Sequence, residues 1–180
     1  FGSKFDSASQ SIAWDPANFA AKAQMPVMLV NSDADQHFSI NSSSLTYGVL
    51  KDGYLSIHHG LSHSQGAGDS IQQVYDFADN MFKGNNPYIR ISSATAENGV
   101  LTADCEIPLG TTISGVTMYY INTTELPSDG GSNINWTAVT DYSENGGTVT
   151  MNIPAGATYV YASITDNNGA IMSTKFLKVK

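Results

Sequence analysis

The pattern of hydrophobic residues changes at residues 83–87, and this change constrains the fold more than any other feature of the sequence. Residues 25–30 form an uninterrupted apolar run, which is typical of a strand buried on both faces of a parallel sheet. After residue 87, apolar and polar residues alternate in several short segments, which is typical of antiparallel strands. The stretch between them, Lys83-Gly-Asn-Asn-Pro87, has the composition of a chain break. We therefore predict two units, residues 1–85 and residues 86–180.

The first unit has the order strand, helix, strand, helix. Residues 42–50 are predicted as a short helix after the first strand, and residues 54–57 as a second strand. In residues 69–82 the apolar positions follow the spacing of an amphipathic helix. A short helix that contains Pro16 near its first turn precedes the first strand. This order predicts an α/β unit with a parallel sheet.

The second unit is predicted to be all-β. Strand-like segments are separated by turns rich in glycine, asparagine, aspartate and proline, and they cover residues 100–107, 113–121, 148–153, 158–164 and 172–179. Short strands at this spacing are typical of an antiparallel, immunoglobulin-like β-sandwich of roughly seven strands. Trp136 is expected to anchor its core.

Composition excludes several classes of partner. The net charge is −8, which argues against nucleic acid or an anionic membrane surface, because phosphate binding needs clustered lysine and arginine. No apolar run approaches the roughly 20 residues of a membrane span. Charged residues make up 13% of the chain, so serine, threonine and asparagine must supply much of the polar surface. Such a surface favours an extracellular, periplasmic or cell-envelope location.

The single cysteine limits the covalent and metal chemistry of the chain, and the first residue suggests processing. Cys105 cannot form an intrachain disulfide, and one cysteine excludes a multi-cysteine zinc site. It lies in an alternating segment, so we expect a half-buried strand residue rather than a catalytic thiol. The chain begins at Phe1 without a visible signal peptide, and we expect it to be a fragment or processed form of a longer protein.

Chemistry-bearing side chains follow both predicted strands of the first unit. Asn31-Ser-Asp-Ala-Asp-Gln-His37 comes after the first strand, and a loop rich in histidine, residues 58–66, comes after the second. Sites in parallel sheets form beyond the carboxyl ends of the strands, so these loops are expected to meet. A carboxylate beside a histidine is the arrangement that orients a catalytic base. The chain order, acid before histidine, is that of α/β-hydrolases.

Two segments carry a more specific resemblance. The sequence from Met25 to Asp35 resembles the segment that carries the acid in α/β-hydrolases of the prolyl-oligopeptidase and acetyl-xylan-esterase type. Leu61-Ser-His-Ser-Gln-Gly66 resembles the loop that carries their histidine, and the similarity covers residues 14–85. The resemblance implies the C-terminal βαβα portion of an α/β-hydrolase sheet with an appended β domain. It also implies a serine hydrolase that cleaves an ester or peptide bond, with Asp35 and His63 as catalytic acid and base and no cofactor.

The nucleophile is missing from this pattern. A Gly-x-Ser-x-Gly elbow should precede the acid, and the sequence contains none. We therefore expect the nucleophile outside this chain and the chain alone to be inactive, with Ser62 or Ser64 as the alternative. Asp33 is the alternative acid, His37 can line the site, and His58 and His59 are expected at a strand end. A metal site is the other use of these ligand types, with candidates Asp33, Asp35, His37, His59 and His63.

A non-catalytic role is the second hypothesis. The sandwich could bind carbohydrate or a protein through exposed aromatic side chains, for which the candidates are Tyr119, Tyr120, Trp136, Tyr142, Tyr159 and Tyr161. Glycosylation patterns at Asn41, Asn122 and Asn135 are expected to be chance matches in a chain of this composition. An unpaired apolar edge of the short parallel sheet also predicts self-association.

Overall fold

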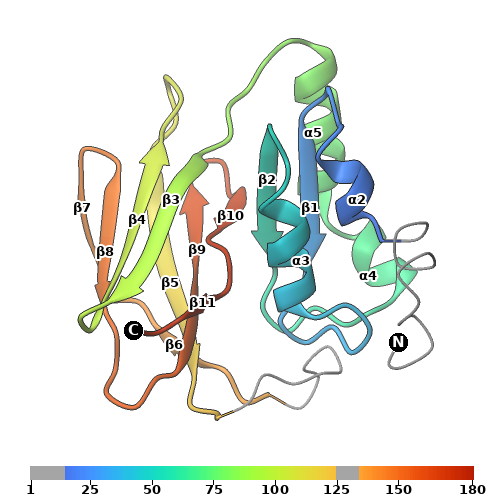
Figure 1. Cartoon of the computed structure of the whole chain (residues 1–180). Helices are drawn as coiled ribbons and strands as arrows, with labels where there is room; N and C mark the ends of the chain where they lie inside the picture. Colours follow the sequence, from blue (N-terminus) through green and yellow to red (C-terminus); the bar gives the residue numbers. More distant parts are fainter. Residues whose placement is uncertain (1–14, 125–133) are drawn as a thin grey trace.

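The computed structural model describes residues 15–124 and 134–180, and it shows a mainly-β protein with antiparallel sheets and few helices (Figure 1). The first segment contains the parallel strands β1 (Val27–Asn31) and β2 (Gly53–Ile57), joined through helix α3 (Ile40–Tyr47). The helices α2 (Ala17–Ala20), α4 (Gln65–Asp69) and α5 (Gln72–Phe82) complete it. None of the helices in the described ranges is long and apolar enough to cross a membrane.

The helix predicted over residues 69–82 is observed as α5, which begins three residues later, at Gln72, after the short helix α4. Ser64 caps α4 by accepting a hydrogen bond from the backbone N–H of Ala67 at 3.1 Å, and α4 ends at Asp69. Ile71 has extended backbone angles and breaks the helical path before α5 begins. The amphipathic spacing therefore belongs to α5, which buries Gln73 and Phe77 against the rest of the molecule.

The remaining strands form two antiparallel sheets (Figure 1). The four-stranded sheet has the order β3-β4-β8-β7, and its strands are β3 (Arg90–Glu97), β4 (Val100–Glu106), β7 (Ser143–Asn145) and β8 (Thr148–Asn152). The five-stranded sheet has the order β10-β9-β5-β6, with β11 also paired to β9. Its strands are β5 (Ile113–Ile121), β6 (Thr137–Val139), β9 (Tyr159–Asp166), β10 (Ile171–Ser173) and β11 (Leu177–Lys178). Each of the five segments predicted as strands overlaps at least one of these elements.

The two antiparallel sheets share one hydrophobic core. Leu101 and Val149 come from the four-stranded sheet and Met118 and Val160 from the five-stranded sheet, and all four are fully buried in the same cluster. Tyr54, Phe77 and Tyr88 belong to this cluster as well, so side chains of β2 and α5 pack on the same core. The core is therefore continuous from the first segment into the sheets.

Strand β2 lies against the five-stranded sheet and is buried along its whole length. The backbone N–H of Ile57 donates a hydrogen bond to Oγ of Ser173 at 2.9 Å, and the carbonyl of Ile57 accepts one from Oγ of Ser163 at 3.3 Å. Polar groups at the end of β2 are thus satisfied by side chains of β9 and β10.

The prediction that residues 1–85 form the C-terminal βαβα portion of an α/β-hydrolase sheet is wrong. Strands β1 and β2 are the one parallel pair in the described parts of the chain, and every other pairing is antiparallel. The apolar pattern indicated strands buried on both faces. For β2 this is observed, but strands of the antiparallel sheet cover it. A hydrophobic run indicates that a segment is buried, but it does not indicate which elements pack against that segment.

One edge of β1 has no strand partner among the described residues. The N–H of Val27 donates to the carbonyl of Asp52, and the carbonyl of Asn31 accepts from the N–H of His58, both at 2.9 Å. Since alternate residues of a strand direct their backbone groups to opposite sides, those of Met28 and Val30 point away from β2. Within residues 15–124 and 134–180, no strand other than β2 pairs with β1.

We expect the chain to self-associate through β1 and the substitution Val30→Pro to abolish this association. Proline removes the outward N–H of residue 30 but none of the hydrogen bonds to β2. Sedimentation velocity over a range of concentrations should show dimers or larger species for the unmodified chain and for Val30→Ala, which keeps the N–H. The prediction fails if the unmodified chain sediments as a monomer at every concentration.

Candidate functional site

The loop after β1 is built by local polar contacts. The side-chain amide of Asn31 donates to the carbonyl of Phe38 at 3.1 Å and to Oγ of Ser43 at 2.5 Å. Oγ of Ser32 accepts a hydrogen bond from the N–H of Ala34 at 2.9 Å. Short side chains with oxygen or amide groups fold back on their own backbone in this way, which fixes the loop. The loop therefore presents Asp33 and Asp35 in defined directions.

Asp35 and His63 are in direct contact. Nδ1 of His63 lies 2.8 Å from Oδ2 of Asp35, and the other carboxylate oxygen accepts hydrogen bonds from the N–H groups of His37 and Phe38 at 2.7 and 2.8 Å. The side chain of Asp35 is 11% exposed and that of His63 is 35% exposed. Two backbone N–H groups thus fix the carboxylate of Asp35, while the imidazole of His63 is partly exposed to solvent.

Several contacts set the protonation of Asp35. Burial acts to raise the pKa of this carboxyl, but the hydrogen bonds from His63 and from the backbone of Phe38 and His37 outweigh it and hold the pKa below its usual value. Asp35 is therefore ionised at neutral pH. An ionised carboxylate on Nδ1 favours the histidine tautomer whose Nε2 can accept a proton.

Asp33 forms a second pair, with His59, in a different environment. Its carboxylate is fully buried, and Oδ2 lies 2.5 Å from Nδ1 of His59 and accepts a hydrogen bond from Oη of Tyr161 at 2.7 Å. Oδ1 accepts from the N–H of Gly60 at 2.8 Å. Nε1 of Trp136 donates to the carbonyl of Asp33 at 3.2 Å. Asp33 therefore connects the two loops to the five-stranded sheet.

The other histidines take distinct positions. The ring of His37 meets that of His63 edge-on, with centroids 4.5 Å apart, and Phe38 covers His63 from a centroid distance of 5.6 Å. His58 directly follows β2, and its Nε2 lies 3.0 Å from Oγ of Ser56. Burial lowers the pKa of His58, which keeps its ring neutral. His37 and Phe38 thus flank His63, while His58 belongs to the packed end of the strand.

The described residues supply neither a partner nucleophile nor a metal site. In residues 15–124 and 134–180, no serine hydroxyl or cysteine thiol forms a hydrogen bond with His63. Oγ of Ser64 is used to cap α4, and Ser62 is exposed. Over the same ranges, no three histidine, cysteine, aspartate or glutamate side chains are grouped closely enough to hold a metal ion. Cys105 is half-buried in β4, and burial raises the pKa of its thiol to about 11, so it is protonated at neutral pH.

The six candidate aromatic residues form no exposed platform. Tyr159 and Tyr161 are buried, and Tyr119, Tyr120, Trp136 and Tyr142 are partly buried. Four of them contact one another or nearby rings: Tyr119 stacks on Tyr161 with centroids 5.0 Å apart, and Trp136 meets Tyr161 edge-on at 5.2 Å. Tyr159 stacks on Phe176 at 5.1 Å. Tyr119, Trp136, Tyr159 and Tyr161 therefore use part of their ring surface in packing the molecule.

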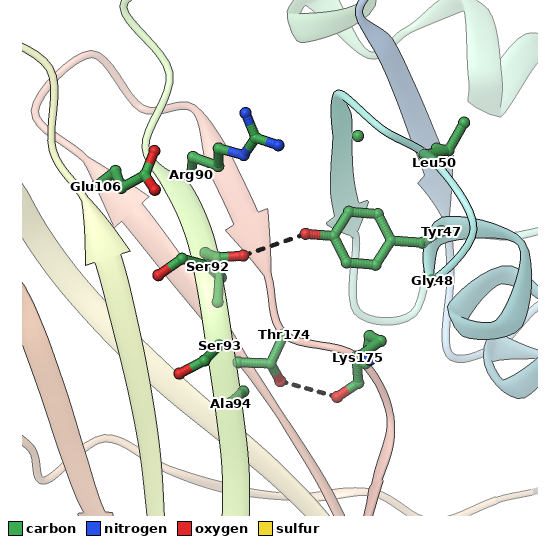
Figure 2. A pocket seen from close by; sticks show the side chains of 12 residues that line it. Tyr47, Gly48, Leu50, Arg90, Ser92, Ser93, Ala94, Glu106, Thr174 and Lys175 are labelled. Atoms are coloured by element: carbon green, nitrogen blue, oxygen red, sulfur yellow. Dashed lines mark hydrogen bonds between the residues drawn. The ribbon is translucent and has the colours of Figure 1, made fainter. Parts of the chain in front are cut away.

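A polar groove lies between α3 and the edge strand β3, and Figure 2 shows the side chains that line it. Its volume is about 640 Å³. Oη of Tyr47 crosses it to donate to the carbonyl of Ile91 at 3.3 Å, and Oγ1 of Thr174 donates to the carbonyl of Lys175 at 3.0 Å. The guanidinium of Arg90 binds Asp52 at 3.3 Å. Neither Asp35 nor His63 lines this groove.

Comparison with known proteins gives little support for any family. No protein-family model matches the sequence, and no curated protein matches it. Among solved structures, the chain is similar to a crystal structure of a DUF3823 family protein from Bacteroides ovatus, with 13% sequence identity and a TM-score of 0.29. The matched region covers 52% of this chain and 55% of that chain, so it spans about half the length of each. A similarity of this size carries no argument about function.

The resemblance to the C-terminal part of an α/β-hydrolase of the prolyl-oligopeptidase or acetyl-xylan-esterase type is therefore wrong as an assignment of family. Sequence comparison returns no such family, and the structure is mainly β with antiparallel sheets. The contact between Asp35 and His63 is a separate observation and does not depend on that assignment.

Proposed function

We propose that Asp35 and His63 form the acid and base of an acyl-transfer site that hydrolyses an ester or peptide bond, with a serine nucleophile supplied by polypeptide outside this chain. The observation that carries the proposal is the 2.8 Å contact between Nδ1 of His63 and Oδ2 of Asp35. The rest of the environment agrees with it, because the carboxylate is fixed by two backbone N–H groups and the imidazole is partly exposed.

Each group has a definite task in this chemistry. Nε2 of His63 takes the proton of the serine hydroxyl as its oxygen attacks the carbonyl carbon of the substrate, and it then gives that proton to the leaving group. Asp35 holds the tautomer with the proton on Nδ1 and stabilises the imidazolium that forms. The ionised state of Asp35, which its hydrogen bonds favour, suits this role. A substrate of this kind is a small ester or a peptide.

Substitution of His63 tests the proposal. The proposal requires a polypeptide that supplies the serine; in its presence His63→Gln should lower kcat for p-nitrophenyl acetate by roughly 10⁴–10⁶-fold, because loss of a triad base leaves only binding and oxyanion stabilisation. His58→Gln is the matched control and should change kcat little, since His58 is bound to Ser56. The chain of residues 1–180 alone should not be labelled by a fluorophosphonate probe. Labelling of Ser62 or Ser64, or full activity of His63→Gln, would contradict the proposal.

A non-catalytic binding module is the second candidate, and the mainly-β architecture favours it. We propose that the two antiparallel sheets form an immunoglobulin-like sandwich, and that any binding of carbohydrate or protein uses the polar groove beside β3 instead of aromatic stacking. Support comes from the burial of the candidate aromatic rings and from the volume of that groove. Oligosaccharide binding that is unchanged in His63→Gln would separate this role from catalysis. An extracellular or cell-envelope location, proposed from composition, suits both candidates.

A further inference from the structure

We infer that Tyr161, on strand β9 of the five-stranded sheet, positions the Asp35–His63 pair by holding the buried carboxylate of Asp33. The catalytic meaning of this inference rests on the proposed function, but the positioning itself does not. Tyr161 is 128 residues from Asp33 in sequence and donates to its Oδ2 at 2.7 Å. The hydroxyl of Tyr161 therefore connects the sheet to the loops of the site, beside the stack of Tyr119 on His59.

Asp33 controls the spacing between the two loops. Its Oδ1 accepts from the N–H of Gly60, and its Oδ2 contacts Nδ1 of His59. Asp33 lies two residues before Asp35, and Gly60 lies three residues before His63. Gly60 has a φ of +72°, in the left-handed region, which lets the backbone turn toward His63 directly after this hydrogen bond. Movement of the Asp33 carboxylate would therefore move both members of the pair.

Tyr161 is itself held rigidly. It is fully buried, it pairs with Tyr119 across β5 and β9, and the two rings stack at 5.0 Å. Trp136, which directly precedes β6, packs edge-on against Tyr161 and donates to the carbonyl of Asp33, so Asp33 is held at a second point. Burial, and then the charge of Asp33, raise the pKa of Tyr161, and its hydroxyl consequently stays a donor.

Loss of that hydroxyl should loosen the loop. A buried carboxylate depends on all its donors, because desolvation of the charge is compensated only by hydrogen bonds. With one donor removed, the carboxylate is expected to shift toward solvent and carry the segment from Asp33 to Asp35 with it. The hydrogen bond between Asp35 and His63 would then lengthen, although neither residue touches Tyr161.

A pair of conservative substitutions tests the inference on the chain of residues 1–180. Tyr161→Phe keeps the ring stack and removes the hydroxyl that binds Asp33. Tyr119→Phe is the matched control, because the hydroxyl of Tyr119 makes no hydrogen bond with the described residues. Nuclear magnetic resonance should report the share of His63 with its proton on Nδ1, through the ring ¹⁵N shifts, and the pKa of Asp35, through the carboxyl ¹³C shift.

We expect Tyr161→Phe to lower the share of that tautomer and to raise the pKa of Asp35 toward its ordinary value, and Tyr119→Phe to change neither. Unchanged signals in a folded Tyr161→Phe protein would overturn the inference, even if its stability fell, because a purely structural tyrosine would leave the pair intact. If Tyr161→Phe does not fold, Asp33→Asn, which keeps the shape of the side chain, gives the same two readouts. These measurements need no nucleophile, so they stand whatever the result for catalysis by His63.

Discussion

Replacement of Asp33 by alanine is expected to lower the free energy of unfolding by at least about 1–3 kcal/mol, the cost of leaving a buried hydrogen-bond donor without its acceptor. The carboxylate of Asp33 is fully buried and accepts from Tyr161 and Gly60 as well as contacting His59. Alanine leaves the hydroxyl of Tyr161 without an acceptor inside the molecule, and an unsatisfied buried donor costs about 1–3 kcal/mol by itself.

Urea unfolding followed by circular dichroism measures this effect, with Asp79→Ala as the control. Asp79 lies on α5, is 74% exposed and forms an exposed ion pair with Lys83 at 3.2 Å. Exposed pairs of this spacing contribute about 0.5 kcal/mol or less, so the control should remain near the unmodified chain. If Asp33→Ala is as stable as Asp79→Ala, the carboxylate of Asp33 does not join the loops to the sheet.

Leu101→Ala is expected to destabilise the protein by about 2–5 kcal/mol, since it removes buried methyl groups and leaves a cavity. Leu101 lies on β4, has no exposed surface, and belongs to the core that the two antiparallel sheets share with Tyr54 of β2. A cavity at this point weakens the contact between both sheets and the first segment.

The matched control is Leu109→Ala, which removes the same atoms from a fully exposed side chain in a loop. Its free energy of unfolding should stay within about 0.5 kcal/mol of the unmodified value. Differential scanning calorimetry should show a single transition that moves to lower temperature in Leu101→Ala only. A transition in which residues of the first segment unfold separately from the sheets would contradict a shared core.

The sequence predicted strands best where apolar and polar residues alternate with large side chains. Strands β4, β5 and β8 have this pattern, whereas β9 is buried at seven of its eight residues. Strand β3 was missed, because serine, alanine and threonine occupy most of Arg90–Glu97 and carry a weak hydrophobic signal. The short strands β6 and β7 were missed for the related reason that all but one of their residues are exposed.

Part of the candidate site could also be predicted from the sequence. Loops that follow adjacent parallel strands lie at one end of the sheet, and this rule brought Asp35 and His63 together, which the structure places 2.8 Å apart. Their catalytic role stays a prediction. The contact of Tyr161 could not be foreseen, because a tyrosine within a strand gives no indication that its hydroxyl meets a carboxylate 128 residues away.

The hydrogen bonds that close the end of β2 have a consequence for the order of folding during synthesis. The backbone N–H of Ile57 donates to the hydroxyl of Ser173, which lies 116 residues later in the chain, and the carboxylate of Asp33 accepts from the hydroxyl of Tyr161. The early segment therefore emerges from the ribosome long before its buried polar groups find their partners, and native contacts this distant in sequence form slowly. Apolar strands that wait for partners this distant are prone to aggregate during that interval.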